Sequence, residues 1–312
     1  MGSIAVTGSV AYDTIMVFGG RFSEHILPDQ AHILNVSFLI DRLDRRRGGT
    51  AANVAYTLAL LGERPLLCAA VGNDFAEYGA ALSAAGVDTS PALLCEDVTT
   101  ATAFITTDLD DNQITAFFPG AMARAAGVNL EALSGVEHVV VTPDAPDGMA
   151  LHIEQAGRLG ARLLFAPAQQ LSSLSDETLT AGLDAAWLVV GNDYELELIH
   201  RRTGRDVEDL LAGGTCVART RGGEGSELHI DGTVHDIPIV AADRVVDPTG
   251  AGDAYIAGLL TGLRAGRSAE VAGRMGALAA TYVVETQGPQ GHAYTRAQFA
   301  ARYERAFGEA LA

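Results

Sequence analysis

The strongest constraint on the fold is a regular alternation of strand and helix patterns in the second half of the chain. Short apolar runs of strand length alternate with segments whose apolar residues recur at helical spacing. The predicted strands are 138–142, 163–166, 187–190 and 215–220, and the predicted helices are 148–159, 194–202, 254–263, 268–284 and 295–307. Short loops between such units favour parallel strands, and a parallel sheet must be covered on both faces. We therefore predict an α/β fold, a three-layer α/β/α sandwich around a mostly parallel central sheet.

Two segments do not follow this alternation. Residues 14–47 contain short alternating stretches, one of them at 33–40, and no convincing long helix. Residues 101–118 have the pattern of a hairpin with an Asp-Asp-Asn turn, which is typical of two antiparallel strands. We predict that both segments form a small β-sheet that projects from the main body. Because no shift in composition marks a linker, we expect one domain over residues 1–312 with these segments inserted in it.

The composition excludes several partners and mechanisms. A net charge of −18 argues against a polyanion such as nucleic acid as the partner, and no apolar run reaches the roughly 18 residues of a membrane span. All 21 basic residues are arginines. This excludes a P-loop, a protein-kinase site and a Schiff-base enzyme, because each requires a lysine. The three cysteines have no metal-ligand spacing. Because they are odd in number and scattered along the chain, we expect free thiols and a location in the reducing cytoplasm.

A glycine-rich turn late in the chain predicts an anion site. Residues 247–254 read Asp-Pro-Thr-Gly-Ala-Gly-Asp-Ala, between a predicted short strand at 244–246 and a predicted helix. The N–H groups of residues 250–252 would point at one position, where the helix dipole also favours negative charge. The carboxylate of Asp253 would repel a phosphate there, unless it acts on a hydroxyl that attacks the phosphate. By itself, the motif is more typical of a glycine-rich turn followed by a helix-capping aspartate, and the functional interpretation depends on the other motifs.

A second glycine pair comes before an earlier helix. Gly48 and Gly49 precede the predicted helix 50–61, whose first turn contains small residues and Asn53. Small residues would let a ligand lie against the start of this helix, and the Asn53 amide would bind it. Helix packing would also explain the alanines, but it explains the asparagine less well. The arginine run at 42–47 is either a solvated strand face or a contact to the phosphate-accepting end of a substrate.

Four motifs now lie at the carboxyl ends of predicted strands, the edge at which open α/β sheets bind ligands. They are RGGTAANVA at 47–55, NDYE at 192–195, TRGGEG at 220–225 and DPTGAGDA at 247–254. In this order they resemble the ribokinase, or PfkB-type, family of carbohydrate and nucleoside kinases, over nearly the whole chain. The resemblance implies a ribokinase-like fold in which the small sheet serves as a lid. It also implies transfer of the γ-phosphate of ATP to a hydroxyl group.

The same resemblance implies roles for individual residues. Asp253 would be the catalytic base, and an anion hole would be formed by the amides of Gly250, Ala251 and Gly252. Sugar hydroxyls would be bound by residues near the first glycine pair, namely Asp13, Gly48, Gly49 and Asn53. Contacts to ATP would come from the ends of two later strands, through Asn192, Glu195, Thr220, Gly222 and Gly225. Of these, Glu195 with Asn192 would position Mg²⁺ through water and the phosphates, and a site for K⁺ is implied beside Asp247 and Thr249.

Further details resemble bacterial adenosine kinases. The stretch 104–122 and the pair Gln169-Gln170 resemble their lid hairpin and base-contacting loop. Phe104 and Phe117 would stack on a purine, and Gln169 or Gln170 would read its edge by hydrogen bonds. The leading hypothesis is therefore a kinase for the 5′-hydroxyl of a nucleoside, adenosine above all, acting as a monomer or a homodimer. The alternatives are a kinase for ribose or another free sugar, and a non-catalytic nucleotide or nucleoside sensor.

Overall fold

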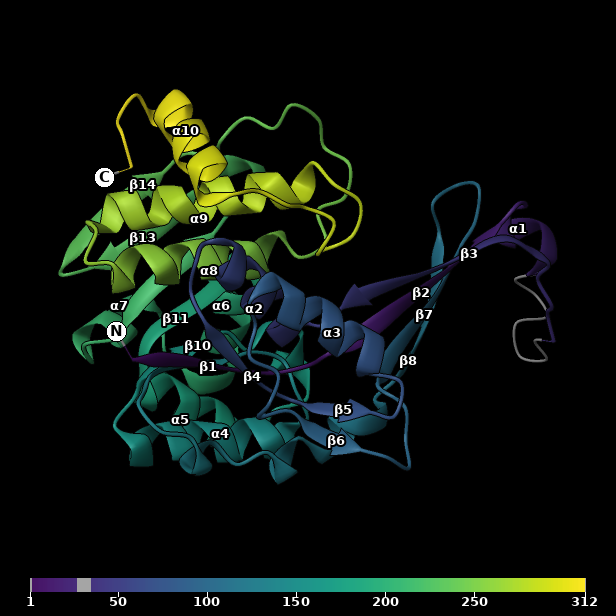
Figure 1. The fold of residues 1–312 in the computed structure, drawn as a ribbon, viewed down its shortest axis with the longest axis horizontal. Coiled ribbons are helices and arrows are strands. Elements are labelled where there is room, and N and C mark those ends of the chain that lie inside the picture. Colours follow the sequence, from purple (N-terminus) through teal and green to yellow (C-terminus); the bar gives the residue numbers. More distant parts are fainter. Residues whose placement is uncertain (1, 27–34, 312) are drawn as a thin grey trace.

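An eight-stranded sheet forms the middle layer of the computed structural model, which describes residues 2–26 and 35–311 (Figure 1). Its strands are β1 (Ser3–Thr7), β4 (Pro65–Cys68), β9 (Val136–Val141), β10 (Arg162–Phe165), β11 (Ala186–Asn192), β12 (Cys216–Thr220), β13 (Ser226–Ile230) and β14 (Thr233–Ile237). They lie in the order β14-β13-β12-β11-β10-β9-β1-β4. The neighbours from β12 to β4 are parallel, and only β13 and β14 at one edge pair antiparallel. The predicted mostly parallel sheet is confirmed.

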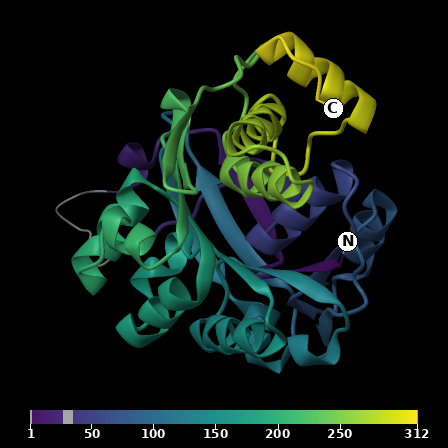
Figure 2. The same ribbon diagram turned by 90° about the vertical axis from the view of Figure 1, so that its left-hand side faces the viewer.

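Helices cover both faces of this sheet because its strands are apolar on both faces. In β9, Val140 belongs to one hydrophobic core, and its neighbours Val139 and Val141 belong to the other, as the alternation of side chains along a strand requires. The first core is closed by α2 (Thr50–Leu60), α3 (Ala76–Ala85), α8 (Ala251–Arg264) and α9 (Ala269–Val284). The second is closed by α4 (Pro146–Leu159), α5 (Asp176–Ala185), α6 (Asp193–Thr203) and α7 (Val207–Ala212). Figure 2 shows the two helical layers on opposite sides of the sheet, and α10 (Arg296–Phe307) packs outside α9.

A separate sheet of four strands projects from the body (Figure 1). Its strands, in spatial order, are β3 (Ile40–Gly48), β2 (Ala11–Phe18), β7 (Ala101–Thr107) and β8 (Gln113–Phe118). The predicted small sheet is thereby confirmed. The predicted strand at 33–40 is wrong over the part that the structure describes, because 35–39 are not in a strand. Phe38 packs instead against the ring of Phe22 in the short helix α1 (Phe22–His25), and the charged segment from Ile40 onward forms β3.

The predicted strand at 244–246 is also absent. The amides of Val246 and Asp247 both donate to the Val284 carbonyl at the end of α9, at 2.7 and 3.2 Å, so no neighbouring strand pairs with this segment. Val245 is 76% exposed, and its apolar character therefore does not reflect burial in a sheet. Elsewhere, β5 (Ala70–Gly72) and β6 (Leu93–Cys95) form a small parallel pair. Within the described ranges, no helix is both long and apolar enough to span a bilayer.

Candidate active site

A cavity of about 530 Å³ lies between the projecting sheet and the body, and we call it the central cavity. Segments far apart in the sequence contribute to its walls: β2, the start of α2, β7 and β8, the loop after β10 and the start of α8. Nine of the residues predicted from the sequence line it, and they are Asp13, Gly49, Asn53, Phe117, Gln169, Gln170, Gly250, Gly252 and Asp253. The tertiary structure therefore places the predicted base, anion hole, sugar-binding residues and base-binding residues around one space.

Asp253 is a carboxylate in the first turn of α8 and lines the central cavity. Burial raises its pKa to about 7, and the hydrogen bond from Asn53 acts in the opposite direction. That bond runs from Asn53 Nδ2 to Asp253 Oδ2 and is 2.9 Å long. A carboxyl group that titrates near neutral pH is well matched to taking a proton from a hydroxyl. The cavity wall thus carries a carboxyl group whose pKa suits the predicted role of a general base.

The turn before α8 needs glycine at one position and leaves space at another. Gly250 has φ 84°, and a Cβ added there would lie 2.4 Å from the Pro289 Cβ. A Cβ added to Gly252 would meet no atom within 4 Å, so this part of the backbone faces the cavity. The predicted role of Ala251 needs correction, because its N–H donates to the Pro248 carbonyl at 3.1 Å and Ala251 is not part of the cavity wall. The part of this turn that lines the cavity is the backbone around Gly250 and Gly252.

The first glycine pair brings β2 close to the start of α2. Gly49 has φ 91°, and an added Cβ would approach the Ala11 N at 2.5 Å and the Ser9 O at 2.6 Å. A Cβ on Gly48 would lie 2.7 Å from Asp13 Oδ2. Gly48 itself is not in the cavity wall, whereas Asp13 is. The pair therefore acts by allowing close approach, which places the Asp13 carboxylate beside the helix start.

Asp13 is a second carboxylate on the cavity wall. Burial raises its pKa, and the nearby carboxylate of Asp247 adds to this effect, while the guanidinium of Arg46 opposes it. Arg46 is the cross-strand neighbour of Asp13 in the projecting sheet. A carboxylate and the Asn53 amide are acceptors and donors suited to a pair of sugar hydroxyls. This arrangement agrees with the sugar-binding role that the sequence predicts.

The hairpin β7–β8 contributes only one of its two predicted aromatic rings. Phe117 pairs with Ala103 across the hairpin, and both line the cavity together with Met122. Phe104 pairs with Ala116 and is not in the cavity wall. Because successive side chains of a strand point to opposite faces, Phe104 lies on the outer face of the projecting sheet. The prediction that Phe104 stacks on a ligand is therefore wrong, whereas Phe117 is in the predicted place.

The loop after β10 presents two amide side chains to the cavity. Ala168 has a φ of 41°, an uncommon conformation for a residue other than glycine, and it lines the cavity with Gln169 and Gln170. Gln170 donates from Nε2 to the Asp144 carbonyl at 2.5 Å, which leaves its side-chain oxygen as an acceptor. Gln169 is exposed. Both glutamines line the same cavity as Phe117, so their predicted role in reading the edge of a purine stays open to test.

The predicted ATP-binding residues lie at the ends of two neighbouring strands and not in the central cavity. Asn192 and Thr220 are paired across β11 and β12. Asn192 and Glu195 form a reciprocal cap of α6, in which each side chain accepts the other's backbone N–H at 2.9 Å. Gly225 has φ 90°, and an added Cβ would lie 2.2 Å from the Ile237 O, whereas Gly222 is surrounded by open space. The motif thus builds a helix cap and an open glycine loop side by side.

The side-chain oxygens of Asn192 and Glu195 are of the kind that holds a hydrated Mg²⁺ ion. Glu195 uses Oε2 in the helix cap, and Oε1 has no hydrogen-bond partner among the described residues. Within those residues no three His, Cys, Asp or Glu side chains gather as a metal site. Mg²⁺ commonly keeps several waters and binds one or two carboxylates together with substrate phosphates, so the free carboxylate oxygen of Glu195 suits it.

Several wall residues were not predicted from the sequence. The wall residues to which the sequence analysis gave no role are Ser9, Ala11, Thr50, Ala103, Met122, Pro143, Ala168 and Pro289. Ser9 follows the end of β1, and its hydroxyl accepts a hydrogen bond from the Thr50 N–H at 3.1 Å. Its place at the carboxyl end of a strand was a signal that could have identified it. Pro289 follows α9 without any local pattern of this kind, and only the fold brings it to the cavity.

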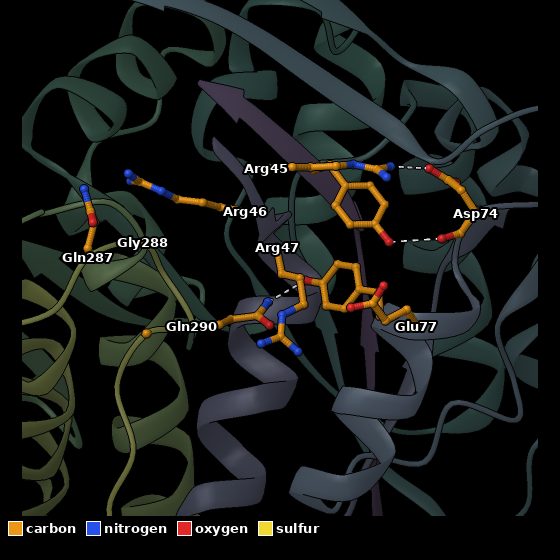
Figure 3. Close-up of a pocket in the computed structure, with 11 residues that line it drawn as sticks. Arg45, Arg46, Arg47, Asp74, Glu77, Gln287, Gly288 and Gln290 are labelled. Carbon is orange, nitrogen blue, oxygen red and sulfur yellow. Dashed lines mark hydrogen bonds and ion pairs between the residues drawn. The ribbon is translucent and has the colours of Figure 1, made fainter. Parts of the chain in front are cut away.

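A second cavity, of about 580 Å³, is lined by three members of the arginine run, Arg45, Arg46 and Arg47 (Figure 3). Arg45 is ion-paired with Asp74 and lies 3.6 Å from the centre of the Tyr12 ring. Arg46 reaches Asp247, with 3.5 Å between Nη1 and Oδ2. The run is therefore not simply a solvated strand face, because one of its members contacts the residue that opens the glycine-rich turn.

The sequence and the fold of this chain are similar to those of known sugar and nucleoside kinases. The profile of the pfkB family carbohydrate kinases matches residues 7–296. A nucleoside kinase of Methanothermobacter thermautotrophicus is 35% identical over 262 residues, which are 82% of this chain and 84% of the relative. The nucleoside kinase of Burkholderia thailandensis in complex with inosine superimposes with a TM-score of 0.87 and 37% identity over 99% of both chains. Its complex with ADP-inosine superimposes with a TM-score of 0.86 and 39% identity, over 99% of this chain and 97% of the other.

Proposed function

Because the chain belongs to the pfkB family of carbohydrate kinases, we propose that it transfers the γ-phosphate of ATP to the 5′-hydroxyl of a nucleoside. The observation that carries this proposal is the position of Asp253. Its carboxylate titrates near neutral pH and lies in one cavity with an open glycine backbone and an aromatic ring. These are a base, an anion site and a platform for a nucleobase.

The chemistry follows from the order of these groups along the cavity. Asp253 accepts the proton of the 5′-hydroxyl as the hydroxyl oxygen bonds to the γ-phosphorus of ATP. The bond between that phosphorus and the bridging oxygen of the β-phosphate breaks, and ADP leaves with the electron pair. The open backbone at Gly252, at the positive end of the α8 dipole, stabilises the charge on the transferred phosphoryl group. Asp13 and Asn53 hold the ribose hydroxyls so that the 5′-oxygen faces Asp253.

A nucleoside fits this cavity better than a free sugar does. Phe117 presents an aromatic ring, and Gln169 and Gln170 present amides next to it. A flat base gains stacking and edge hydrogen bonds from such a wall, and a free sugar would leave it unused. The complexes of the Burkholderia thailandensis relative with inosine and ADP-inosine support a purine nucleoside. We propose adenosine as the preferred substrate, with inosine as its main competitor.

ATP would lie along the edge formed by Thr220, Gly222 and Gly225, with its phosphates toward α8. Glu195 would hold Mg²⁺ there through water, assisted by Asn192, and the ion would neutralise phosphate charge during transfer. The carboxylate of Asp247 already accepts the N–H groups of Thr249 and Gly288, each at 3.0 Å. We propose that a K⁺ ion binds beside Asp247. Activity should then fall when NaCl replaces KCl in the assay.

The projecting sheet would act as a lid over the nucleoside in a protein of one domain. Closure would exclude water and suppress hydrolysis of ATP.

The outer face of this sheet carries Leu43, Phe104, Ile114 and Phe118, each more than two-fifths exposed. Light scattering will show whether the protein is a monomer or a homodimer. The three cysteines are free thiols, which agrees with the proposed cytoplasmic location.

The proposal is tested by measuring ATP consumption with Mg²⁺ against a panel of nucleosides and free sugars. Turnover of adenosine or another nucleoside with a KM in the micromolar range, as is common for enzymes with specific substrates, is the expected result. Turnover of ribose alone would keep the roles of Asp253 and Gly252 and refute the base-binding role of Phe117. Tight nucleoside binding without turnover would favour the sensor.

A further inference from the structure

A chain of side-chain hydrogen bonds leads from Asp253 out of the central cavity to the loop between α9 and α10. Asn53 donates to Asp253 at 2.9 Å, and Asn53 Oδ1 accepts a bond from Gln290 Nε2, also at 2.9 Å. The same Nε2 donates to the Tyr78 hydroxyl at 2.5 Å, and that hydroxyl donates to the Gly48 carbonyl at 2.8 Å. Gln290 is labelled in Figure 3, where it lies in the wall of the second cavity.

The donor and acceptor roles in this chain are fixed from its outer end. A backbone carbonyl can only accept, so the single hydroxyl hydrogen of Tyr78 is used on Gly48, and the Tyr78 oxygen remains as an acceptor. Gln290 must then turn its NH₂ group, and not its oxygen, toward Tyr78. The second hydrogen of this NH₂ group meets Asn53 Oδ1, which leaves the NH₂ group of Asn53 to face Asp253.

The orientation of Asn53 matters because its two ends have opposite effects on a carboxylate. Asn53 is 5% exposed and Tyr78 is 1% exposed, so little water is available to replace a lost partner. In the observed orientation, the Asn53 amide donates a hydrogen bond to Asp253. After a flip of the amide, Asn53 Oδ1 would face the carboxylate and repel its ionised form.

We propose that Gln290 is a positioning residue for phosphoryl transfer, which holds Asn53 in the orientation that keeps Asp253 ionised and aimed into the cavity. This inference rests on the kinase function proposed above. Gln290 lies in none of the four motifs that identify the family, and it does not line the central cavity. It acts on the base through Asn53 alone.

No nearby charge takes over the influence that the Asn53 hydrogen bond has on the ionisation of Asp253. The charged groups on the surrounding elements include Asp13, Arg46, Arg47, Glu77, Asp247, Glu285 and Arg302. None of them is among the influences on the pKa of Asp253. Arg46 contacts Asp247, and Glu285 is ion-paired with Arg302 at the end of α9. Helix α2, which carries Asn53, has no charged side chain. The pKa of Asp253 is raised by burial and lowered by the Asn53 bond, so the orientation of Asn53 is the adjustable influence on it.

The test compares the pH dependence of kcat/KM in the wild-type enzyme, Gln290→Leu and Gln290→Glu. Loss of the Gln290 donor should move the acid limb to higher pH by about half to one unit, as expected for one weakened hydrogen bond to a carboxylate. Gln290→Glu should move it further, since a glutamate cannot donate to Asn53 Oδ1 and favours the flipped amide. The matched control is Gln287→Leu, because Gln287 lies in the same loop and cavity wall and outside the hydrogen-bond chain. An unmoved acid limb, or an equal loss of activity at every pH, would overturn the proposal.

A second measurement does not depend on turnover. The side-chain carboxyl ¹³C signals of aspartate are titrated in the wild-type protein and in Gln290→Leu, and Asp253→Asn identifies the signal of Asp253. We expect the Asp253 titration to move to higher pH in Gln290→Leu. If this occurs in a protein that phosphorylates no nucleoside, the proposed function fails and the positioning role of Gln290 stands. If the enzyme is active and the titration is unmoved, the positioning role alone is refuted.

Discussion

Asn53 on α2 and Asp253 on α8 are 200 positions apart in the sequence, and a hydrogen bond of 2.9 Å joins their side chains. Both helices begin at a glycine with positive φ, Gly49 for α2 and Gly250 for α8. Both helix starts also meet at the central cavity. A half-buried carboxylate is thereby supplied with a neutral donor, and the proposed base lies next to the group that would orient the sugar.

Replacement of Asp253 by asparagine should remove the base and little else. We expect kcat to fall by about three orders of magnitude or more, since general-base catalysis contributes effects of this size, while calorimetry shows nucleoside binding largely retained. Asp13→Asn is the matched control, and it should raise KM more than it lowers kcat. Near wild-type turnover of Asp253→Asn would refute the assignment of the base.

The pH dependence of the reaction should report the ionisation of Asp253. Only the ionised carboxylate can accept the proton of the attacking hydroxyl, so kcat/KM should rise with pH and level off above the pKa of about 7. The acid limb should therefore lie well above the range near pH 4 where an ordinary aspartate titrates. Rate measurements from pH 5 to pH 9 check this, and an acid limb near pH 4 would contradict it.

Asp144 should make the stability of the protein depend on pH. Its Oδ1 accepts the Ala145 N–H at 2.8 Å, and its Oδ2 is buried without a partner. Burial raises its pKa to about 7. The unfolded chain loses this proton near pH 4 and the folded protein only near pH 7, so stability contributed by Asp144 is present below pH 4 and is lost as the pH rises to 7.

Asp144→Asn should remove this loss. We expect it to stabilise the protein at pH 8 by up to about 4 kcal/mol relative to its effect at pH 4. Denaturant unfolding at both pH values measures the difference, and Asp243→Asn at an exposed position is the control. Equal effects of Asp144→Asn at the two pH values would show that this carboxyl group titrates normally.

The two phenylalanines of the hairpin should behave differently. Phe117→Ala should raise the KM for the nucleoside by about 2- to 10-fold with a smaller change in kcat, because the loss of an aromatic contact costs about 0.5–1.5 kcal/mol. Phe104→Ala, on the other face of the same sheet, is the matched control and should leave KM unchanged. Steady-state kinetics with adenosine and inosine decide, and an equal rise in both variants would mean that the hairpin acts only through its fold.

The glycines before and within α8 should separate folding from catalysis. Gly250→Ala places a methyl group against Pro289 in a backbone with positive φ, so both the melting temperature and kcat should fall. Gly252→Ala meets no neighbouring atom and lies in a helix, so the melting temperature should hold while the added methyl group obstructs the phosphate. Unchanged kcat in Gly252→Ala would argue against a phosphoryl group at this position.

Local sequence patterns were enough to predict the layers of the fold and the kinds of side chain in the candidate site. Apolar runs at strand and helix spacing predict a parallel sheet covered on both faces, because local periodicity decides which side chains share a face. Two glycine motifs could also be recognised from the sequence, namely the turn before Asp253 and the pair before Asn53. Both were recognisable because a helix start that binds an anion needs small residues. The sequence did not show where the strand with the arginine run begins, because charged strands lack the apolar alternation.

Only the tertiary structure decided which of these residues meet. The register of β7 and β8 turns Phe117 into the cavity and Phe104 out of it, and a shift of one residue would exchange them. The link from Gln290 to Asp253 joins three segments that have no local relation in the chain. Hydrogen bonds of this kind depend on distances between elements, which are set by packing across the core, and no pattern within a single segment encodes them.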